Sequence, residues 1–411
     1  MRICRLHVWG AAWAVLLLAI AAASAGALPT QTQVTTPSGT SITIVRDDFG
    51  VPHVVAGSVE DAFFGDGYAV AEDRLAQMAK YRFSAWGRLA EIEGPTALEE
   101  DKETRLLSPT TDELRGEIAS LPPELQTALQ AYADGVNAYV AQAQQAGALP
   151  EAFAKYEDAW APWEPLDSVV VGTMMARRFG GEGGEELRNL RILQALKEGF
   201  GDQAQAIFDD LFWTNDPAAP TTIPASESAT GPSPTALRVG PVPLLARAES
   251  APLERAYAQL FGPEVRVRRE ALGLPDKMGS YAWVVAPSRS ASGNALLLGG
   301  PQMGFSTPQI AHEIHLMAPG MNVIGMGFAG IPTVLIGHNE HLAWTTTSAI
   351  GDAIDTFAEQ TAPDSPERYL YRGEWREMTR RVETIKVKGS DPVTYEIYST
   401  VHGPAVERDD K

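Results

Sequence analysis

Polar and apolar residues alternate near the start of the chain and then change to a helical spacing. Alternation over residues 41–45 and 51–55, with a turn at residues 47–50, predicts a β-hairpin. From residue 59 to residue 92 the apolar positions recur three and four apart, which predicts a long helix. The chain therefore opens with a small β unit that leads directly into a helical one.

Further helices are predicted in the next hundred residues. One begins at Pro122 and Pro123, because proline is favoured in a first helical turn and an apolar stripe follows it. Residues 169–179 are apolar and end in two arginines and a phenylalanine, and residues 186–198 are again helical in pattern. From residue 215 to residue 236 the composition changes to Pro, Ser, Thr and Ala, which is typical of a linker, and residues 252–279 add a short helix.

After residue 280 the pattern becomes strand-rich. We expect strands at residues 282–286, 295–298, 321–324, 333–336, 342–347 and 355–359, and a hairpin that pairs residues 383–387 with 394–400. Helices come first, then a spacer, then strands, and this order favours an α+β fold with a layered core. At 411 residues the chain is long enough for a sizeable core and more than one compact unit.

Charge and cysteine content narrow the class of protein. The formal net charge of −19 argues against a nucleic-acid partner, because phosphate binding needs clustered lysines and arginines. The single cysteine is Cys4, so the part of the chain behind it has no disulfide and no thiol nucleophile.

Residues 1–27 have the pattern of a signal peptide. Arg2 and Arg5 precede an alanine- and leucine-rich apolar run, and two small-x-small cleavage sites follow, ending at Ala25 and Ala27. The run is also long enough for an uncleaved membrane anchor, but the small residues at its end favour removal. We therefore expect a periplasmic or secreted protein that has no membrane segment once the signal is removed.

Ser280 is the main candidate for chemistry. It follows Gly279 at the head of an apolar, strand-forming run, directly behind the spacer. A serine in this position could become a new N-terminal residue if the chain is cut in front of it. Its hydroxyl would then be the nucleophile and its own α-amine the base, since an α-amine has a pKa of about 7.7–8.0 and is partly neutral near pH 7.

The chain resembles the penicillin acylase family of N-terminal-nucleophile hydrolases along most of its length. In the first part the resemblance lies in Arg46-Asp47, Phe49-Gly50-Val51-Pro52-His53, Gly65-x-Gly67-Tyr68-x-x-Ala71-x-Asp73-Arg74-Leu75-x-Gln77-Met78 and Gly87-Arg88-Leu89. In the second part it lies in Ser280-x-x-Trp283, Gly300-Pro301-Gln302, Gly337-His338-Asn339, Ala343-Trp344-x-x-Thr347, Asp352-x-x-Asp355 and Val401-His402-Gly403-Pro404. The order of these motifs on both sides of a spacer makes chance similarity improbable.

The resemblance implies a precursor that cuts itself twice. Residues 28–225 would form a small chain, residues 226–279 a spacer that leaves, and residues 280–411 the start of a large chain that stays bound to the small one. The family's core is an αββα sandwich. Ser280 would form an acyl-enzyme, Gln302 would help to hold spacer and substrate near it, and the backbone N–H of Ser348 would serve the oxyanion hole.

The resemblance also implies a substrate pocket and a calcium ion. Met175, Phe179, Met303 and Ile336 match positions around an apolar acyl pocket, although core packing explains each of them equally well. Arg178 matches an arginine at the pocket edge that meets a substrate carboxylate, and its alternative is a surface charge. The calcium ligands would be Glu186, Asp352, the carbonyl of Ile354, and Asp355; the neighbouring Glu185 leaves the first of these uncertain by one residue.

Three alternatives stay open beside a penicillin G type acylase for β-lactams or other N-acyl amides. An acylase for acyl-homoserine lactones or cyclic lipopeptides would share the fold and take longer acyl chains. An exported binding or scaffold fragment would keep the bond between Gly279 and Ser280 intact. A zinc hydrolase is disfavoured, because His312-Glu313-Ile314-His315 has the wrong ligand spacing. The family's large chain continues well past residue 411, so we expect the 411 residues alone to lack turnover.

Overall fold

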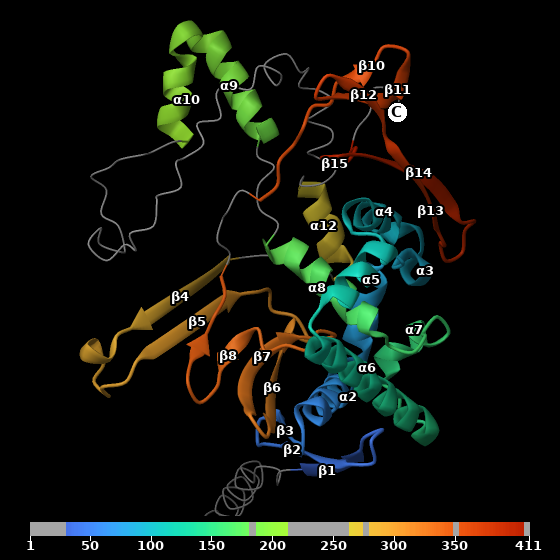
Figure 1. Ribbon diagram of the computed structural model, residues 1–411, viewed down its shortest axis with the longest axis vertical. Coiled ribbons are helices and arrows are strands. Elements are labelled where there is room, and N and C mark those ends of the chain that lie inside the picture. Colours follow the sequence, from blue (N-terminus) through green and yellow to red (C-terminus); the bar gives the residue numbers. More distant parts are fainter. Residues whose placement is uncertain (1–29, 181–185, 213–262, 274–278, 348–352, 407–411) are drawn as a thin grey trace, which may run out of the picture.

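The computed structural model describes residues 30–180, 186–212, 263–273, 279–347 and 353–406. Three strands open the described chain, helices follow them, and the remaining strands occupy the last part, as Figure 1 shows. This mixed content confirms the predicted α+β class. Within the described residues, none of the helices is both long and apolar enough to cross a membrane.

Seven strands form the largest sheet in the described part of the chain, in the order β1-β2-β3-β6-β7-β8-β9. They are β1 (Thr30–Thr35), β2 (Ser41–Arg46), β3 (Pro52–Val55), β6 (Ala311–Ala318), β7 (Met321–Phe328), β8 (Ile336–His338) and β9 (Ala343–Trp344). Neighbouring strands are antiparallel except β3 and β6, which run parallel with Val54 opposite Leu316. The N-terminal hairpin and the strands behind Ser280 therefore share one hydrogen-bonded sheet.

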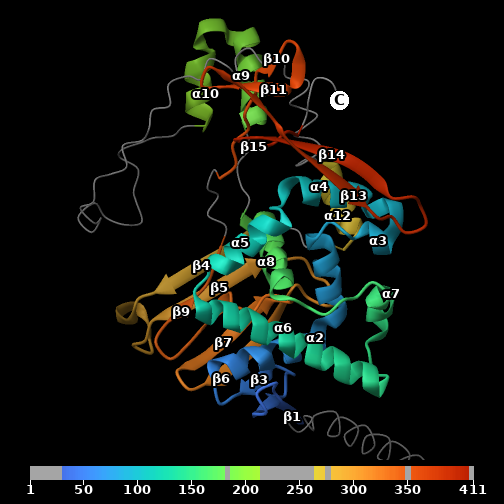
Figure 2. The same ribbon diagram turned by 45° about the vertical axis from the view of Figure 1, so that its right-hand side comes forward.

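Two long helices, α2 (Val59–Ala85) and α6 (Pro123–Ala146), lie against one face of this sheet (Figure 2). Ser58 caps the start of α2, since its hydroxyl accepts a hydrogen bond from the backbone N–H of Asp61 at 3.0 Å. The two helices cross at glycines: a Cβ built at Gly67 would lie 2.0 Å from the carbonyl oxygen of Tyr132, and one at Gly135 would lie 1.9 Å from that of Phe64. Only glycine permits so close an approach of two backbones.

Most of the other helices continue the helical layer, whereas α9 (Glu186–Phe200) and α10 (Ala204–Phe212) pack against each other and lie apart from it (Figure 1). The helices of the layer are α3 (Ala90–Glu93), α4 (Leu98–Leu107), α5 (Thr111–Ser120), α7 (Ala154–Glu157), α8 (Pro165–Gly180) and α12 (Pro263–Ala271). A capping box begins α5, in which Thr110 and Glu113 satisfy each other's backbone N–H groups. The main core joins both parts of the chain, because Tyr132 and Val171 from the helices pack in one cluster with Ile314 and Phe328 from the sheet.

Three smaller sheets complete the described strands. They pair β4 (Gly279–Val285) with β5 (Leu296–Gln302); β10 (Thr361–Ala362) with β11 (Ser365–Tyr371) and β12 (Glu374–Glu377); and β13 (Thr379–Ile385) with β14 (Val393–Thr400) and β15 (Gly403–Pro404). The β13–β14 hairpin lies on the helical layer, where Ile385 is buried beside Leu89 and Arg105 pairs with Glu383 at 2.9 Å.

Most predicted elements are confirmed, one predicted strand is wrong, and strand β6 was not predicted. The hairpin of β2 and β3, the long helix α2, the helix beginning at the two prolines and the hairpin of β13 and β14 all form. No strand forms over residues 355–359, although that segment is described. Strand β6 was missed: its central His-Glu-Ile-His segment is polar in composition, yet His312, Ile314 and Leu316 are its buried positions.

Asp66 gives a pH-dependent prediction for this core. Its side chain is buried in α2, and burial raises the pKa of its carboxyl to about 8. Between the unfolded pKa near 4 and the folded pKa, only the folded state holds this proton, so stability falls by about 1.4 kcal/mol per pH unit as the pH rises. We expect Asp66→Asn to flatten this slope and to raise the urea midpoint at pH 7 more than at pH 5. Equal gains at the two pH values would contradict the assignment.

Candidate active site

Ser280 lies at the start of β4, in the two-stranded ribbon that β4 forms with β5. Ser280 pairs with Pro301, and Gly279 pairs with Gln302. The Oγ of Ser280 donates a hydrogen bond to the carbonyl oxygen of Gly279 at 2.5 Å. The hydroxyl therefore lies beside the carbonyl group that it would attack in a cut between the two residues.

Gly279 has a backbone conformation that only glycine adopts readily. Its φ is +148°, and a Cβ built there would lie 2.8 Å from Oε1 of Gln302. The side chain of Gln302 thus lies against the peptide in front of Ser280.

Two glycines of β5 leave room for side chains of neighbouring segments to pack against this strand. A Cβ at Gly300 would meet the ring of Tyr281 at 2.3 Å, and one at Gly299 would meet Oγ1 of Thr345 at 2.2 Å. Thr345 directly follows β9, so the end of the large sheet lies close to the β4–β5 ribbon at this residue. Its Oγ1 is buried without a hydrogen-bond partner among the described residues. Ser348, the expected oxyanion residue, lies outside the described residues.

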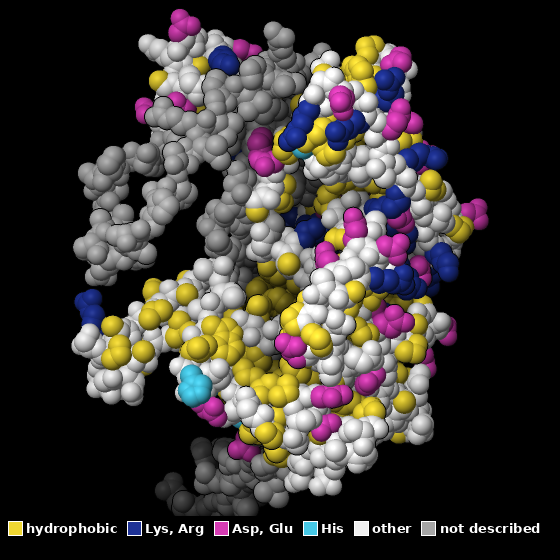
Figure 3. Space-filling view, viewed as in Figure 1, with side chains coloured by type: hydrophobic (Ala, Val, Ile, Leu, Met, Phe, Trp, Pro, Cys, Tyr) yellow, Lys and Arg dark blue, Asp and Glu magenta, His cyan; other side chains and the backbone are white. Residues whose placement is uncertain are grey.

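Three of the four expected acyl-pocket residues belong to the main core, and Ile336 is not among the described members of that cluster. Met175 is buried in that cluster, and Phe179 and Met303 pack against it. The ring of Phe179 stacks on Phe328 with 5.5 Å between ring centroids. Ile336 begins β8, opposite Met326 of β7. Figure 3 shows apolar side chains gathered in the recess between the β4–β5 ribbon and the helices.

Arg178 is not the surface charge that the alternative interpretation describes. Its side chain is 3% exposed, and its Nη2 donates to Oε1 of Glu100 at 2.6 Å and to Oγ of Ser84 at 3.4 Å. Burial lowers the pKa of Arg178 to about 10, so it remains charged at neutral pH. Glu100, which pairs with Arg178, and its neighbour Glu103 were not singled out in the sequence; Arg268 and Arg269 contact both carboxylates.

The expected calcium ligands are only partly described. Glu186 is the first residue of α9, Ile354 and Asp355 lie in an irregular segment, and Asp352 lies outside the described residues. Nowhere in the described ranges do three acidic, histidine or cysteine side chains gather as metal ligands. Oε2 of Glu186 and Oδ1 of Asn189 are both buried one helical turn apart, and Oδ1 has no hydrogen-bond partner among the described residues. Such oxygen atoms fit a hard cation such as calcium.

Comparison with known proteins gives the class of this chain. The family model for penicillin amidase matches residues 41–411. Penicillin G acylase of Escherichia coli is 35% identical over 90% of this chain and 46% of its own length. Acyl-homoserine lactone acylase QuiP of Pseudomonas aeruginosa is 31% identical over 89% of this chain and 40% of its own length. A thermostable penicillin G acylase structure from Alcaligenes faecalis has a TM-score of 0.40 at 32% identity, covering 48% of this chain and 98% of that one.

The chain belongs to the penicillin amidase family. It spans about half the length of the curated relatives that it matches.

Proposed function

We propose that this chain is part of a self-processing amide hydrolase in which Ser280 first cuts its own precursor and then attacks N-acyl substrates. The observation that carries this proposal is the geometry at the bond between Gly279 and Ser280. The hydroxyl of Ser280 donates a hydrogen bond to the carbonyl oxygen of Gly279. The φ of Gly279 is one that only glycine adopts readily, and the side chain of Gln302 lies against the same peptide.

The cut proceeds as an N→O acyl shift. Oγ of Ser280 attacks the carbonyl carbon of Gly279, the C–N bond breaks, and the hydroxyl proton ends on the serine nitrogen. Water then hydrolyses the new ester, which leaves a carboxylate on Gly279 and a free amine on Ser280. In later turnover this amine accepts the hydroxyl proton as Oγ attacks a substrate carbonyl, and water releases the acid from the acyl-enzyme. The backbone N–H of Ser348 stabilises the developing oxyanion.

The proposed processing divides the chain at the boundaries given by the resemblance. A signal at residues 1–27 directs the protein to the periplasm or medium, residues 28–225 form the small chain, and residues 226–279 leave. Parallel pairing of β3 with β6 supports a heterodimer that survives the cuts, because these strands lie on opposite sides of the spacer. Residues 280–411 begin the large chain.

An amide with an apolar acyl group is the substrate class that the apolar residues favour. Met175, Phe179 and Met303 all belong to the apolar main core, and apolar side chains of this kind suit a small aromatic acyl group such as that of a penicillin G type substrate. QuiP, by its name, acts on acyl-homoserine lactones, so a longer acyl chain is the second candidate. An inactive exported scaffold is the candidate from another class, and it would leave the chain uncut.

Ser280→Ala should abolish the cut, because it removes the only atom that attacks Gly279. Expressed protein would be separated by denaturing electrophoresis and weighed by mass spectrometry. The wild-type chain should give a fragment that starts at Ser280, and the variant should give none. Ser288→Ala is the matched control, since Ser288 is exposed in the same segment and the variant should process normally. Equal cutting in the wild type and Ser280→Ala would overturn the proposal.

Calcium should stabilise the protein through Glu186, Asp352, the carbonyl of Ile354, and Asp355. Bound calcium would supply positive charge that ties α9 to the segment behind Ser348. At a concentration about 100 times its Kd, a ligand stabilises the folded state by about 2.7 kcal/mol, so the Tm should rise on addition of calcium and fall with a chelator. Glu186→Gln should remove this shift, whereas the control Glu198→Gln, at an exposed position of the same helix, should keep it. A Tm that ignores calcium would refute the site.

A further inference from the structure

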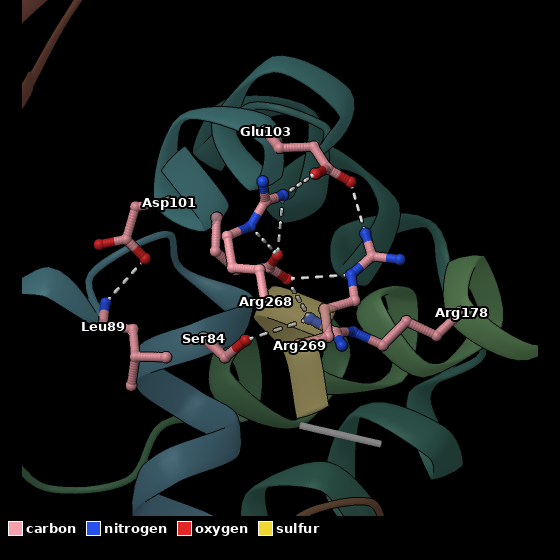
Figure 4. A network of polar contacts seen from close by, with 8 residues as sticks. Ser84, Leu89, Asp101, Glu103, Arg178, Arg268 and Arg269 are labelled. Carbon is pink, nitrogen blue, oxygen red and sulfur yellow. Dashed lines mark hydrogen bonds and ion pairs between the residues drawn. The ribbon is translucent and has the colours of Figure 1, made fainter. Parts of the chain in front are cut away.

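A buried pair of carboxylates on α4 holds the arginines of α12. Glu100 and Glu103 have side chains that are 1% and 7% exposed. Arg268 of α12 donates from Nη2 to Oε2 of Glu103 at 2.6 Å and to Oε2 of Glu100 at 3.3 Å. Arg269 donates from Nη2 to Oε1 of Glu103 at 2.5 Å and from Nε to Oε1 of Glu100 at 3.4 Å (Figure 4). Charge-assisted bonds of this kind are about twice as strong as neutral ones.

The same carboxylates face more positive charge than they can neutralise. Arg178 occupies Oε1 of Glu100, and Arg177 approaches from the same helix, so four guanidinium groups meet two carboxylates. Both Nη atoms of Arg177 are buried without a hydrogen-bond partner among the described residues. Burial lowers the pKa of Arg177, and the nearby charge of Arg269 acts in the same direction. A buried cation without a partner is destabilising, so Arg177 destabilises the arrangement in which α12 keeps it from the two carboxylates.

We propose that Glu100 and Glu103 form a docking site for a pair of guanidinium groups, that α12 occupies this site in the uncut chain, and that Arg177 competes with α12 for it. The site is specific for guanidinium because two carboxylates side by side match its planar fork of donors. It lies in the helical layer, apart from the ribbon that carries Ser280.

Docking of α12 would restrain the segment in front of the proposed cut. Ala271 ends the helix, and Nζ of Lys80 also donates to the carbonyl oxygen of Gly273 at 2.9 Å. From Gly273 only six peptide steps lead to Gly279, which is at most about 22 Å of extended chain. If the chain is cut before Ser280, as the proposed function requires, α12 loses its covalent link to the ribbon. Two carboxylates and two arginines, Arg177 and Arg178, then remain in balance, which favours release of the segment.

Hydrogen exchange in an uncut chain tests the docking site separately from the cut. All variants carry Ser280→Ala, so the bond stays intact whether or not the proposed function is correct. Mass spectrometry would follow the amides of residues 264–271. Arg268→Gln with Arg269→Gln should accelerate their exchange by at least about tenfold, because the helix loses its charge-assisted bonds. Glu270→Gln is the control at an exposed position of the same helix, and it should leave exchange within about twofold.

Arg177→Gln tests, in the same experiment, whether Arg177 competes with α12 for the two carboxylates. Removing a buried, competing cation should slow the exchange of α12 by about threefold or more, whereas loss of a structural arginine would accelerate it. Glu103→Gln should accelerate exchange in α12 while the amides of α6 stay protected, which separates undocking from unfolding. Unchanged exchange in the double arginine variant, or faster exchange in Arg177→Gln, would overturn the proposal. Failure of the cut itself would instead appear in the Ser280 and Ser288 comparison.

Discussion

Gly135→Ala should destabilise the protein by about 3 kcal/mol or more, at the upper end of the range for overpacked cores. The new Cβ would lie 1.9 Å from the carbonyl oxygen of Phe64 and 2.9 Å from the backbone nitrogen of Tyr68. Neither atom can move without shifting the whole of α2 away from α6. Because α2 also lies on the sheet, where Gly65 leaves room for Val54, the shift would spread into the main core. Urea unfolding followed by circular dichroism would measure the change.

Gly116→Ala is the matched control for this prediction. Gly116 also lies inside a helix, in α5, but a Cβ built there meets nothing within 4 Å. Alanine is the better helix former, so this variant should gain about 0.5–1 kcal/mol. If both glycine variants unfold at the same urea concentration, the close crossing of the two helices does not limit stability.

Asp167→Ala should lower the free energy of unfolding by about 3–5 kcal/mol, because it leaves the buried guanidinium of Arg82 without its charged partner. The side chains of Arg82 and Asp167 are 9% and 4% exposed, and Nη2 of Arg82 lies 2.9 Å from Oδ2 of Asp167. The carboxylate also accepts from Nε1 of Trp86 at 2.8 Å and from the backbone N–H of Glu164 at 2.8 Å. Burial lowers the pKa of Arg82, and Asp167 acts against this shift. Without Asp167, the hydrogen-bond partners of the guanidinium among the described residues are the carbonyl oxygens of residues 161 and 162.

A double variant and a surface pair complete this test. Arg82→Met together with Asp167→Leu should cost less than Asp167→Ala alone, since no unpaired charge stays in the core. Arg115→Ala removes an exposed ion pair with Asp112 and should change stability by less than about 1 kcal/mol. Thermal or urea midpoints would rank the three variants. A double variant that is the least stable of the set would contradict the argument.

The sequence indicated the elements whose apolar spacing is regular and missed those set by distant contacts. Helix α2 and the β13–β14 hairpin follow from local periodicity, so they could be predicted. Strand β6 owes its place to parallel pairing with β3, more than 250 residues earlier, and nothing local indicates that pairing. The crossing of α2 and α6 at Gly67 and Gly135 likewise depends on tertiary packing, which the presence of two glycines in the sequence does not indicate.

The sequence singles out the candidate residues that belong to a motif. Ser280, Gly279 and Gln302 are adjacent in the structure because β4 and β5 pair antiparallel. The carboxylates of Glu100 and Glu103 could not be found this way. They lie in a helix that looks like an ordinary charged surface helix, and only the fold shows that Arg178, Arg268 and Arg269 converge on them.

The account depends most on the bond between Gly279 and Ser280. The direct measurement is N-terminal sequencing of every polypeptide in the purified wild-type protein, together with its intact mass. We predict one polypeptide that begins Ser-Tyr-Ala-Trp, with a free amine on Ser280. A preparation in which this bond stays whole, and no polypeptide begins at Ser280, would contradict the proposed hydrolase.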